Sequence, residues 1–233
     1  MNQNQINDAT YEAIYWWNRD ENYYHQYFSK FDSIYIDKDL LKFFTNKIFE
    51  VFLREYSIRR NISKGYENVD IFIDELFEFK FIENVKNGNQ GIIDEVSDKI
   101  KIKNSSTTRH TKSLLSKIAF LVNPNAFYLY DTLAKNSIYD IYKQTKKFTR
   151  TDLDNYSFFA KQTNSLRQEI TTNSFFNNSN EILNKFKNTD AYDFFLKNKD
   201  AFEMRITDKF LWLRQNQNGR ELKNEKYTDL LRT

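Results

Sequence analysis

The stretch SKIAFLVNPNAFYLYDTLAKNSI, from Ser116 to Ile138, holds the only proline of a 233-residue chain that also has just four glycines. Ile118 to Val122 is apolar on every side, which predicts a helix that is buried all round. Pro124 cannot continue this helix, because it lacks an N–H donor and pushes Asn123 out of the right-handed helical region. Asp131 then stands where its carboxylate can cap the amides of a second helix. The stretch therefore predicts two helices joined by a short aromatic connection.

The rest of the chain also has few residues that break helices, and its strong periodicities are helical. We expect a long helix from about Asp37 to Arg60, and others from about Val69 and from Asn198 to Arg214. NGNQG, at residues 87–91, is the clearest break. The sequence therefore predicts an all-α, multi-helix domain over residues 1–233 that could divide into lobes at 1–88 and 92–233.

Composition excludes several kinds of site. The chain has no cysteine, so it can form neither disulfides nor thiolate metal sites. His25 and His110 are the only histidines and lie far apart without a surrounding motif. No basic start precedes an apolar run, and no stretch approaches eighteen consecutive apolar residues. We expect a cytoplasmic protein that needs no membrane, no metal and no cofactor.

Positive charge is concentrated in one part of the chain. The span from Lys99 to Arg150 has eleven basic and two acidic residues, a net charge of +9 in a chain whose total is +3. Such a span is either a solvated surface balanced by acidic neighbours or the binding surface for a polyanion. The phosphate contacts predicted for the second case are Arg109, Lys112, Lys135, Lys143, Lys146, Lys147 and Arg150.

The opening stretch resembles the core of helix-hairpin-helix DNA glycosylases over about residues 109–138. The features that match are a lysine on a buried helix (Lys117), an apolar run, a turn with proline, and an aspartate that heads the next helix (Asp131). The same sequence pattern also resembles that of uncharacterised bacterial proteins associated with defence against phage. In place of the family's glycine-rich hairpin turn, this chain has Thr111-Lys-Ser-Leu-Leu.

The resemblance implies that the protein cleaves N-glycosidic bonds in DNA, with Asp131 and Lys117 as catalytic residues. Asp131 would stabilise positive charge on the sugar, and Lys117 would either attack the sugar carbon or stay protonated and pair with Asp131. Such enzymes stack an extruded base between rings. The candidate rings are Phe127, Tyr128, Tyr130, Tyr139 and Tyr142.

A second motif, RITDKFLW, lies near the C-terminus from Arg205 to Trp212. Arg205, Asp208 and Trp212 can share one helix face, because they are three and four residues apart. We interpret them, together with Pro124, as structural residues. The Arg–Asp pair beside the tryptophan would hold the last helix onto the core.

Three hypotheses follow from the sequence. The first is a DNA glycosylase, in which Asp131 is catalytic. The second is a non-catalytic module that binds nucleic acid or protein in a defence or toxin system, in which Asp131 is only a helix cap. The third is a helical structural protein. For the first two, the concentrated positive charge fits DNA and would equally fit RNA.

Overall fold

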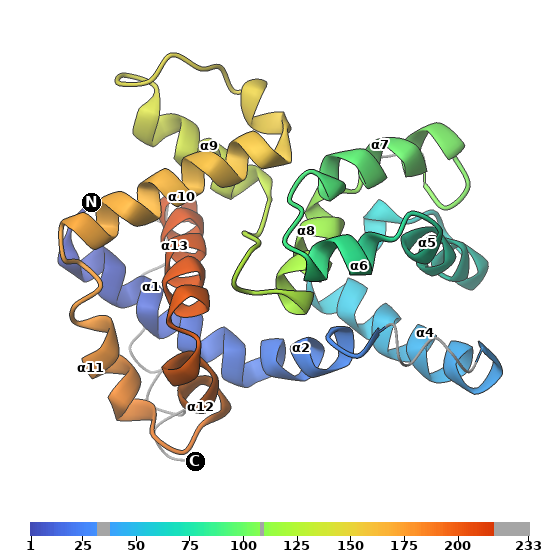
Figure 1. The fold of residues 1–233 in the computed structure, drawn as a ribbon, viewed down its shortest axis with the longest axis horizontal. Helices are drawn as coiled ribbons and strands as arrows, with labels where there is room; N and C mark the ends of the chain where they lie inside the picture. The colour runs from blue at the N-terminus through green and yellow to red at the C-terminus, as the bar shows by residue number, and fades with distance from the viewer. Residues whose placement is uncertain (32–37, 108–109, 217–233) are drawn as a thin grey trace. The chain divides into compact units, whose positions relative to one another are not determined.

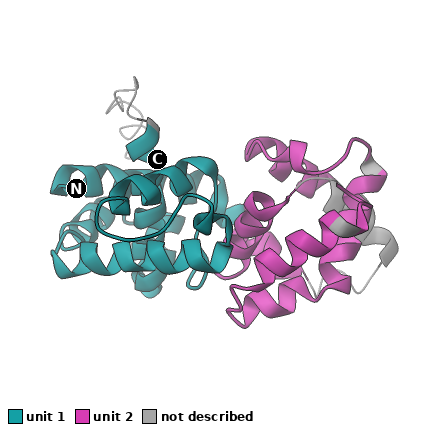
Figure 2. Ribbon diagram, turned by 90° about the horizontal axis from the view of Figure 1, so that it is seen from above, with its two compact units in different colours: residues 1–23, 124–233 teal, residues 24–123 magenta. Residues whose placement is uncertain are grey.

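A computed structural model of the protein describes residues 1–31, 38–107 and 110–216. These residues form helices and no strand, so the predicted all-α class is confirmed for them (Figure 1). They divide into two compact units, shown in Figure 2: unit 1 is residues 1–23 and 124–233, and unit 2 is residues 24–123. The predicted break at 87–91 lies inside unit 2, as the turn between two of its helices.

Unit 2 begins within α2 (Asn22–Phe28) and continues with α4 (Lys38–Glu55), α5 (Tyr66–Glu78), α6 (Phe81–Lys86), α7 (Ile92–Lys103) and α8 (Lys112–Val122). The predicted N-cap Asp37 lies outside the described residues. α4 ends before the predicted Arg60, and Ser57 follows it with a left-handed backbone (φ 54°). α6 packs against α5, α7 and α8, and every residue of α8 from Leu114 onward is buried, as predicted for its apolar part.

Pro124 marks the point at which the chain returns from unit 2 to unit 1. Asn123 ends α8 with a non-helical backbone (φ −140°, ψ 80°), as the following proline requires. Its side-chain amide donates hydrogen bonds to the carbonyl oxygens of Val85 and Lys86 at 3.1 and 3.3 Å. The single proline therefore ends a buried helix and also coincides with the boundary between the units.

Unit 1 is built around α13 (Lys199–Asn216), which packs against α1 (Gln3–Trp16), α9 (Thr132–Tyr142), α10 (Tyr156–Thr172) and α12 (Asp190–Lys197). A π-helical turn, η1 (Trp17–Glu21), continues α1, and α11 (Ser179–Leu183) also packs on α1. α13 and α1 lie side by side in Figure 1. Trp17 joins η1 to α12, because its buried ring stacks on Phe194 with 4.1 Å between ring centroids.

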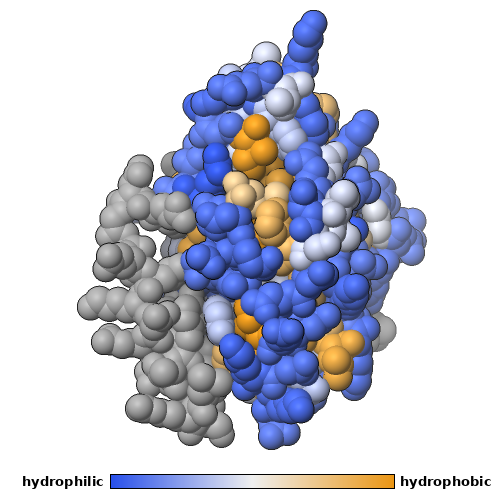
Figure 3. Space-filling view, turned by 90° about the vertical axis from the view of Figure 1, so that its left-hand side faces the viewer, coloured by the Kyte–Doolittle hydropathy of each residue, from blue (hydrophilic) through white to orange (hydrophobic). Residues whose placement is uncertain are grey.

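Apolar side chains fill the two cores. On the face of the molecule shown in Figure 3, hydrophilic residues predominate and small groups of apolar residues reach the surface between them. Within the described residues, no helix combines the length and apolar character that crossing a lipid bilayer requires.

Candidate functional site

Asp131 occupies the N-cap position of α9, as the sequence predicts. Its backbone is extended (φ −148°, ψ 175°), and its Oδ1 accepts a hydrogen bond of 2.8 Å from the amide of Ala134. The side chain is partly exposed. Asp131 therefore satisfies an amide that the helix leaves unpaired, while its carboxylate stays within reach of solvent.

The connection before Asp131 is held at two points. The hydroxyl of the buried Tyr156 donates to the carbonyl oxygen of Tyr128 at 2.9 Å and accepts from the Tyr128 amide at 3.0 Å. The next amide, that of Leu129, lies 3.3 Å from both carboxylate oxygens of Asp208. These bonds fix the extended backbone two residues before Asp131, and so they fix the place at which its carboxylate is presented.

The five rings predicted to line a base pocket fall into two groups. Phe127, Tyr128 and Tyr142 are buried in the core of unit 1, whereas Tyr130 and Tyr139 are partly exposed. Burial raises the pKa of Tyr128, and burial together with a hydrogen bond to the Glu169 carboxylate raises that of Tyr142. Of these five rings, the ones that are partly accessible to solvent are therefore Tyr130 and Tyr139.

Lys117 lies in α8 and belongs to unit 2, whereas Asp131 belongs to unit 1. The Lys117 side chain is buried, and its Nζ donates to the hydroxyl of Ser113 at 3.0 Å. The predicted partial burial of this lysine is therefore present. A functional pairing of Lys117 with Asp131 remains a prediction.

Three basic residues of the charged span in unit 2 are paired with nearby acids. Lys112 lies 2.7 Å from Asp94, with both side chains less than one fifth exposed. Lys99 pairs with Glu95 and Lys103 with Glu78, each at 2.6 Å. Arg109 lies outside the described residues. Acids on neighbouring turns and helices therefore balance three of these charges, whereas Lys101 contacts His110 at 2.8 Å and Lys117 donates to Ser113.

Apart from Lys135, the basic residues of the charged span that belong to unit 1 lie just after the end of α9. We call Lys143, Lys146, Lys147 and Arg150 the α9 cluster. Two of these cations lie over tyrosine rings: Lys146 Nζ is 3.6 Å from the ring centroid of Tyr142, and the Arg150 guanidinium is 4.9 Å from that of Tyr139. Lys143, Lys147 and Arg150 are exposed, and Lys146 is partly exposed. Of the other predicted phosphate contacts, Lys135 is already paired with Asp154 at 2.5 Å.

One acid, Asp140, lies within the α9 cluster. It accepts hydrogen bonds from Lys143 at 3.2 Å and from Gln215 at 3.1 Å. Partial burial acts to raise the pKa of Asp140, but these bonds and the nearby charge of Arg150 outweigh it and lower the pKa. Asp140 therefore stays ionised and offsets one of the four positive charges.

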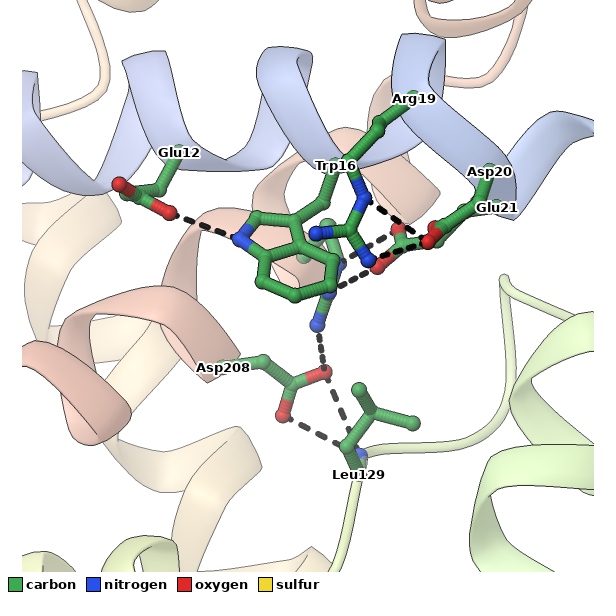
Figure 4. A network of polar contacts seen from close by, with 8 residues as sticks. Glu12, Trp16, Arg19, Asp20, Glu21, Leu129 and Asp208 are labelled. Carbon is green, nitrogen blue, oxygen red and sulfur yellow. Dashed lines mark hydrogen bonds and ion pairs between the residues drawn. The ribbon is translucent and has the colours of Figure 1, made fainter. Parts of the chain in front are cut away.

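A second group of charges is buried at the centre of unit 1, and we call Glu21, Arg205, Asp208 and Lys209 the α13 cluster. Arg205 donates through Nε to Glu21 at 3.0 Å and makes a second, shorter bond to it through Nη2, while its Nη1 lies 3.9 Å from Asp208 (Figure 4). The side chains of Glu21, Arg205 and Asp208 are all at most 3% exposed. The predicted Arg205–Asp208 pair is present, and Glu21 is the closer partner of the arginine.

Burial shifts the pKa values of two ionisable residues that follow Arg205, Asp208 and Lys209. It raises the pKa of Asp208 to about 8, although the positive charge of Arg205 and the Leu129 amide act in the opposite direction. It lowers the pKa of Lys209 well below its usual value, and the charge of Arg205 acts in the same direction. The Asp131 carboxylate also contributes to the raised pKa of Asp208, which links the α13 cluster to the start of α9.

Trp16 stands at the edge of the α13 cluster (Figure 4). Its indole N–H donates to the buried Glu12 at 2.8 Å. The Arg19 guanidinium lies 3.8 Å and Lys209 Nζ 4.1 Å from Trp16 rings. The predicted structural residue Trp212 lies farther from Lys209, at 5.6 Å.

Sequence reasoning did not find Glu21, Lys209 or Tyr156. Glu21 lies 184 positions from Arg205, and it reaches the cluster from a π-helical turn, a feature that often marks functional sites. The spacing within RITDKFLW pairs Arg205 with Asp208 but says nothing about a partner from the other end of the chain. Lys209 is part of the same motif, and only its burial distinguishes it from a surface lysine.

No predicted site residue lines the pocket between α10, α11 and α13, whose volume is about 200 Å³. This is smaller than usual small-molecule pockets, which span roughly 300–1,000 Å³. Its charged lining residues, Lys199 and Glu203, pair with each other at 3.7 Å. Among the described residues, no group of three or more histidines, aspartates or glutamates is placed to hold a metal ion.

Comparison with known proteins adds no relationship to this description. No protein-family model, no curated protein and no solved structure matches the chain.

Proposed function

We propose that the protein binds nucleic acid through the α9 cluster. The observation that carries this proposal is the contrast within the charged span. In unit 2 the basic residues Lys99, Lys103 and Lys112 are paired with acids. In unit 1, Lys135 and Lys143 are also paired with acids, but Lys146 and Arg150 lie over tyrosine rings and Lys147 is exposed.

This arrangement suits a phosphate backbone for two physical reasons. A cation over a ring keeps its full charge, because the ring carries no opposite net charge. The contact also restricts the side chain before binding, so less conformational entropy is lost when a phosphate binds. Lysine and arginine side chains that neutralise phosphates also release counterions, which gives affinity without sequence preference. The partly exposed ring of Tyr139 adds a surface on which a base can stack.

The test is a triple charge reversal, Lys143→Glu, Lys146→Glu and Lys147→Glu. We expect the affinity for a DNA duplex to fall by at least tenfold at moderate salt, and the slope of log K against log salt to become shallower by about 3, roughly one per lost phosphate contact. Fluorescence anisotropy with a labelled duplex, repeated at several salt concentrations, measures both quantities. The same titration with a single strand and with RNA identifies the preferred nucleic acid.

A matched control uses the part of the charged span that lies in unit 2. The variant Lys99→Glu, Lys101→Glu, Lys103→Glu changes the net charge by the same amount, at residues where at least Lys99 and Lys103 are already paired. It should weaken binding much less than the α9 variant does. Equal losses in the two variants would mean that net charge alone governs association, and the α9 cluster would then have no special role.

A second candidate, cleavage of an N-glycosidic bond in DNA, is favoured by the way in which Asp131 is held. The Asp131 carboxylate is partly exposed at the N-terminus of α9, after a connection fixed by Tyr156 and Asp208, in the same unit as the α9 cluster. A carboxylate fixed in this way can stabilise the positive charge that develops on a sugar as its base departs, and it can orient the attacking water.

Asp131→Asn tests this candidate, because asparagine is also a good N-cap residue but carries no charge. We expect base release from duplexes that each carry one damaged base (uracil, 8-oxoguanine or 3-methyladenine) to fall by orders of magnitude, with little change in melting temperature or DNA affinity. Unchanged base release in Asp131→Asn, or none from the parent protein, would leave DNA binding as the better account of the function.

A further inference from the structure

The amino group of Lys209 has unusual surroundings for a lysine. The side chain is only 6% exposed. Its Nζ lies 4.1 Å from a Trp16 ring and 5.6 Å from a Trp212 ring. The residues that the structure describes give this group no hydrogen bond and no ion pair. Both tryptophans are partly exposed, so this buried amine lies close to the surface of unit 1.

The charged groups around Lys209 come from three elements. Arg205 and Asp208 belong to the same helix, Glu12 comes from α1, and Glu21 comes from η1. Glu21 is occupied by two bonds from Arg205, Glu12 accepts the Trp16 indole N–H, and Asp208 accepts the Leu129 amide. The carboxylates near Lys209 therefore already have other donors.

Arg19 completes the surroundings. Its guanidinium lies over Trp16 and donates to Asp20 at 2.9 Å. It therefore adds positive charge near the tryptophan, and the carboxylate that it bonds here is not part of the α13 cluster. Burial and the charge of Arg205 both disfavour the ammonium form of Lys209. The tryptophan rings act in the opposite direction, because a ring face attracts a cation. The burial of an unpaired ammonium group is the larger effect.

We propose that Lys209 is a reactive amine that forms an imine with a small aldehyde entering beside Trp16 and Trp212. This proposal is independent of the function proposed for the α9 cluster. It rests on the burial of Lys209, on the closeness of its Nζ to two indole rings and on the buried carboxylates near it.

The step is a condensation that needs no oxidant or reductant. The lone pair of the neutral Lys209 Nζ attacks the carbonyl carbon, and the carbonyl π electrons move to oxygen, which receives one of the two nitrogen protons through water to give a carbinolamine. The nitrogen lone pair then forms the C=N double bond as the C–O bond breaks, and the hydroxyl leaves as water with the second nitrogen proton. Water reverses the reaction, so the ligand is held reversibly.

The surroundings act on the imine as well as on the amine. Burial and the charge of Arg205 oppose a positive charge on the imine as they do on the amine, and Glu21 and Glu12 act in the opposite direction. The planar C=N group of the imine can also lie against an indole face, as planar cations do. An exposed lysine has neither advantage, because it is almost entirely protonated at neutral pH and its imine is fully hydrated.

Site-resolved labelling of the wild-type protein tests the proposal. Glycolaldehyde is the probe, with cyanoborohydride added to reduce the imine at pH 7, and peptide mass spectrometry gives the initial rate at each lysine. We expect Lys209 to react at least tenfold faster than Lys143 and Lys147, although these are far more exposed, since each unit by which a pKa is lowered gives about tenfold more neutral amine. Labelling of Lys209 no faster than that of the exposed lysines would overturn the proposal.

Two variants sharpen the test. Lys209→Arg should remove the fast phase of labelling, and Lys187→Arg, the matched control at an exposed lysine, should leave it unchanged. A fast phase that persists in a folded Lys209→Arg protein would mean that another group reacts, and would overturn the assignment. Because the wild-type rates are compared within one molecule, the test still decides the matter if Lys209→Arg fails to fold.

Discussion

The α9 cluster and the α13 cluster both combine basic side chains with aromatic rings in unit 1, but they differ in burial. Lys146 and Arg150 lie over tyrosine rings at the surface, whereas Lys209 lies over tryptophan rings in the interior. At the surface, water and salt screen the charges, so the contacts contribute little to stability and leave the cations available to a ligand. Where the charges are buried, the same kinds of contact affect the free energy of unfolding and shift pKa values. The role of such a contact therefore depends on how deeply the charged group is buried and not on the types of residue that form it.

The largest effect on stability is expected where the charge is most deeply buried. Arg205→Ala leaves Glu21, which is 0% exposed, as an uncompensated buried charge. We expect a loss of about 3–5 kcal/mol in the free energy of unfolding, the range typical of a broken buried pair. Urea denaturation followed by circular dichroism measures it.

A double variant separates loss of the pair from loss of packing. Arg205→Met with Glu21→Leu removes both charges and keeps apolar volume, so it should recover most of the stability lost in Arg205→Ala. If Arg205→Ala costs less than about 1 kcal/mol, the α13 cluster is no more important to folding than a surface pair.

The next effect is a pH dependence caused by Asp208. Its pKa in the folded protein is about 8, above the value near 4 expected in the unfolded chain. Between these values the folded state binds more protons than the unfolded state, so the contribution of Asp208 to stability is fully present below about pH 4 and is lost as the pH rises towards 8. The free energy of unfolding contributed by this residue should fall by up to about 1.4 kcal/mol per pH unit.

Asp208→Asn isolates this contribution, since its side-chain oxygen can still accept from the Leu129 amide. The stability of the parent relative to Asp208→Asn should decrease steadily in denaturant titrations from pH 5 to pH 8 and then level off. Lys209 is present in both proteins, so most of its opposite contribution cancels. A difference that grows with rising pH would show that Arg205 keeps Asp208 ionised.

The smallest effect is expected at the surface. The triple reversal of Lys143, Lys146 and Lys147 should change the free energy of unfolding by less than about 1 kcal/mol, because these side chains are at least partly exposed and solvated. The measurement is the same urea titration. A loss comparable to that of Arg205→Ala would remove the distinction between the two clusters, and the binding defect of the variant would then reflect unfolding.

The fold class and the α8–α9 region could be predicted because their determinants are local. A run apolar on every side predicts a buried helix, proline ends it, and aspartate caps the next helix through an amide three residues away. NGNQG, the clearest break in the sequence, is a turn within unit 2. Turn residues mark where a helix ends, and they do not show which helices pack together.

By itself, the sequence determined the all-α class, the end of α8 at Pro124, the capping role of Asp131 and the Arg205–Asp208 spacing, all set by residues within a few positions of one another. Only the tertiary structure decided which basic residues face acids, that Glu21 is the main partner of Arg205, and that Lys209 is buried. These depend on which helices pack together, and packing joins residues far apart in the chain. The charge of a segment can be counted from its sequence, but the burial of each charged group cannot. Burial decides whether a charged group binds a ligand, stabilises the fold or becomes neutral.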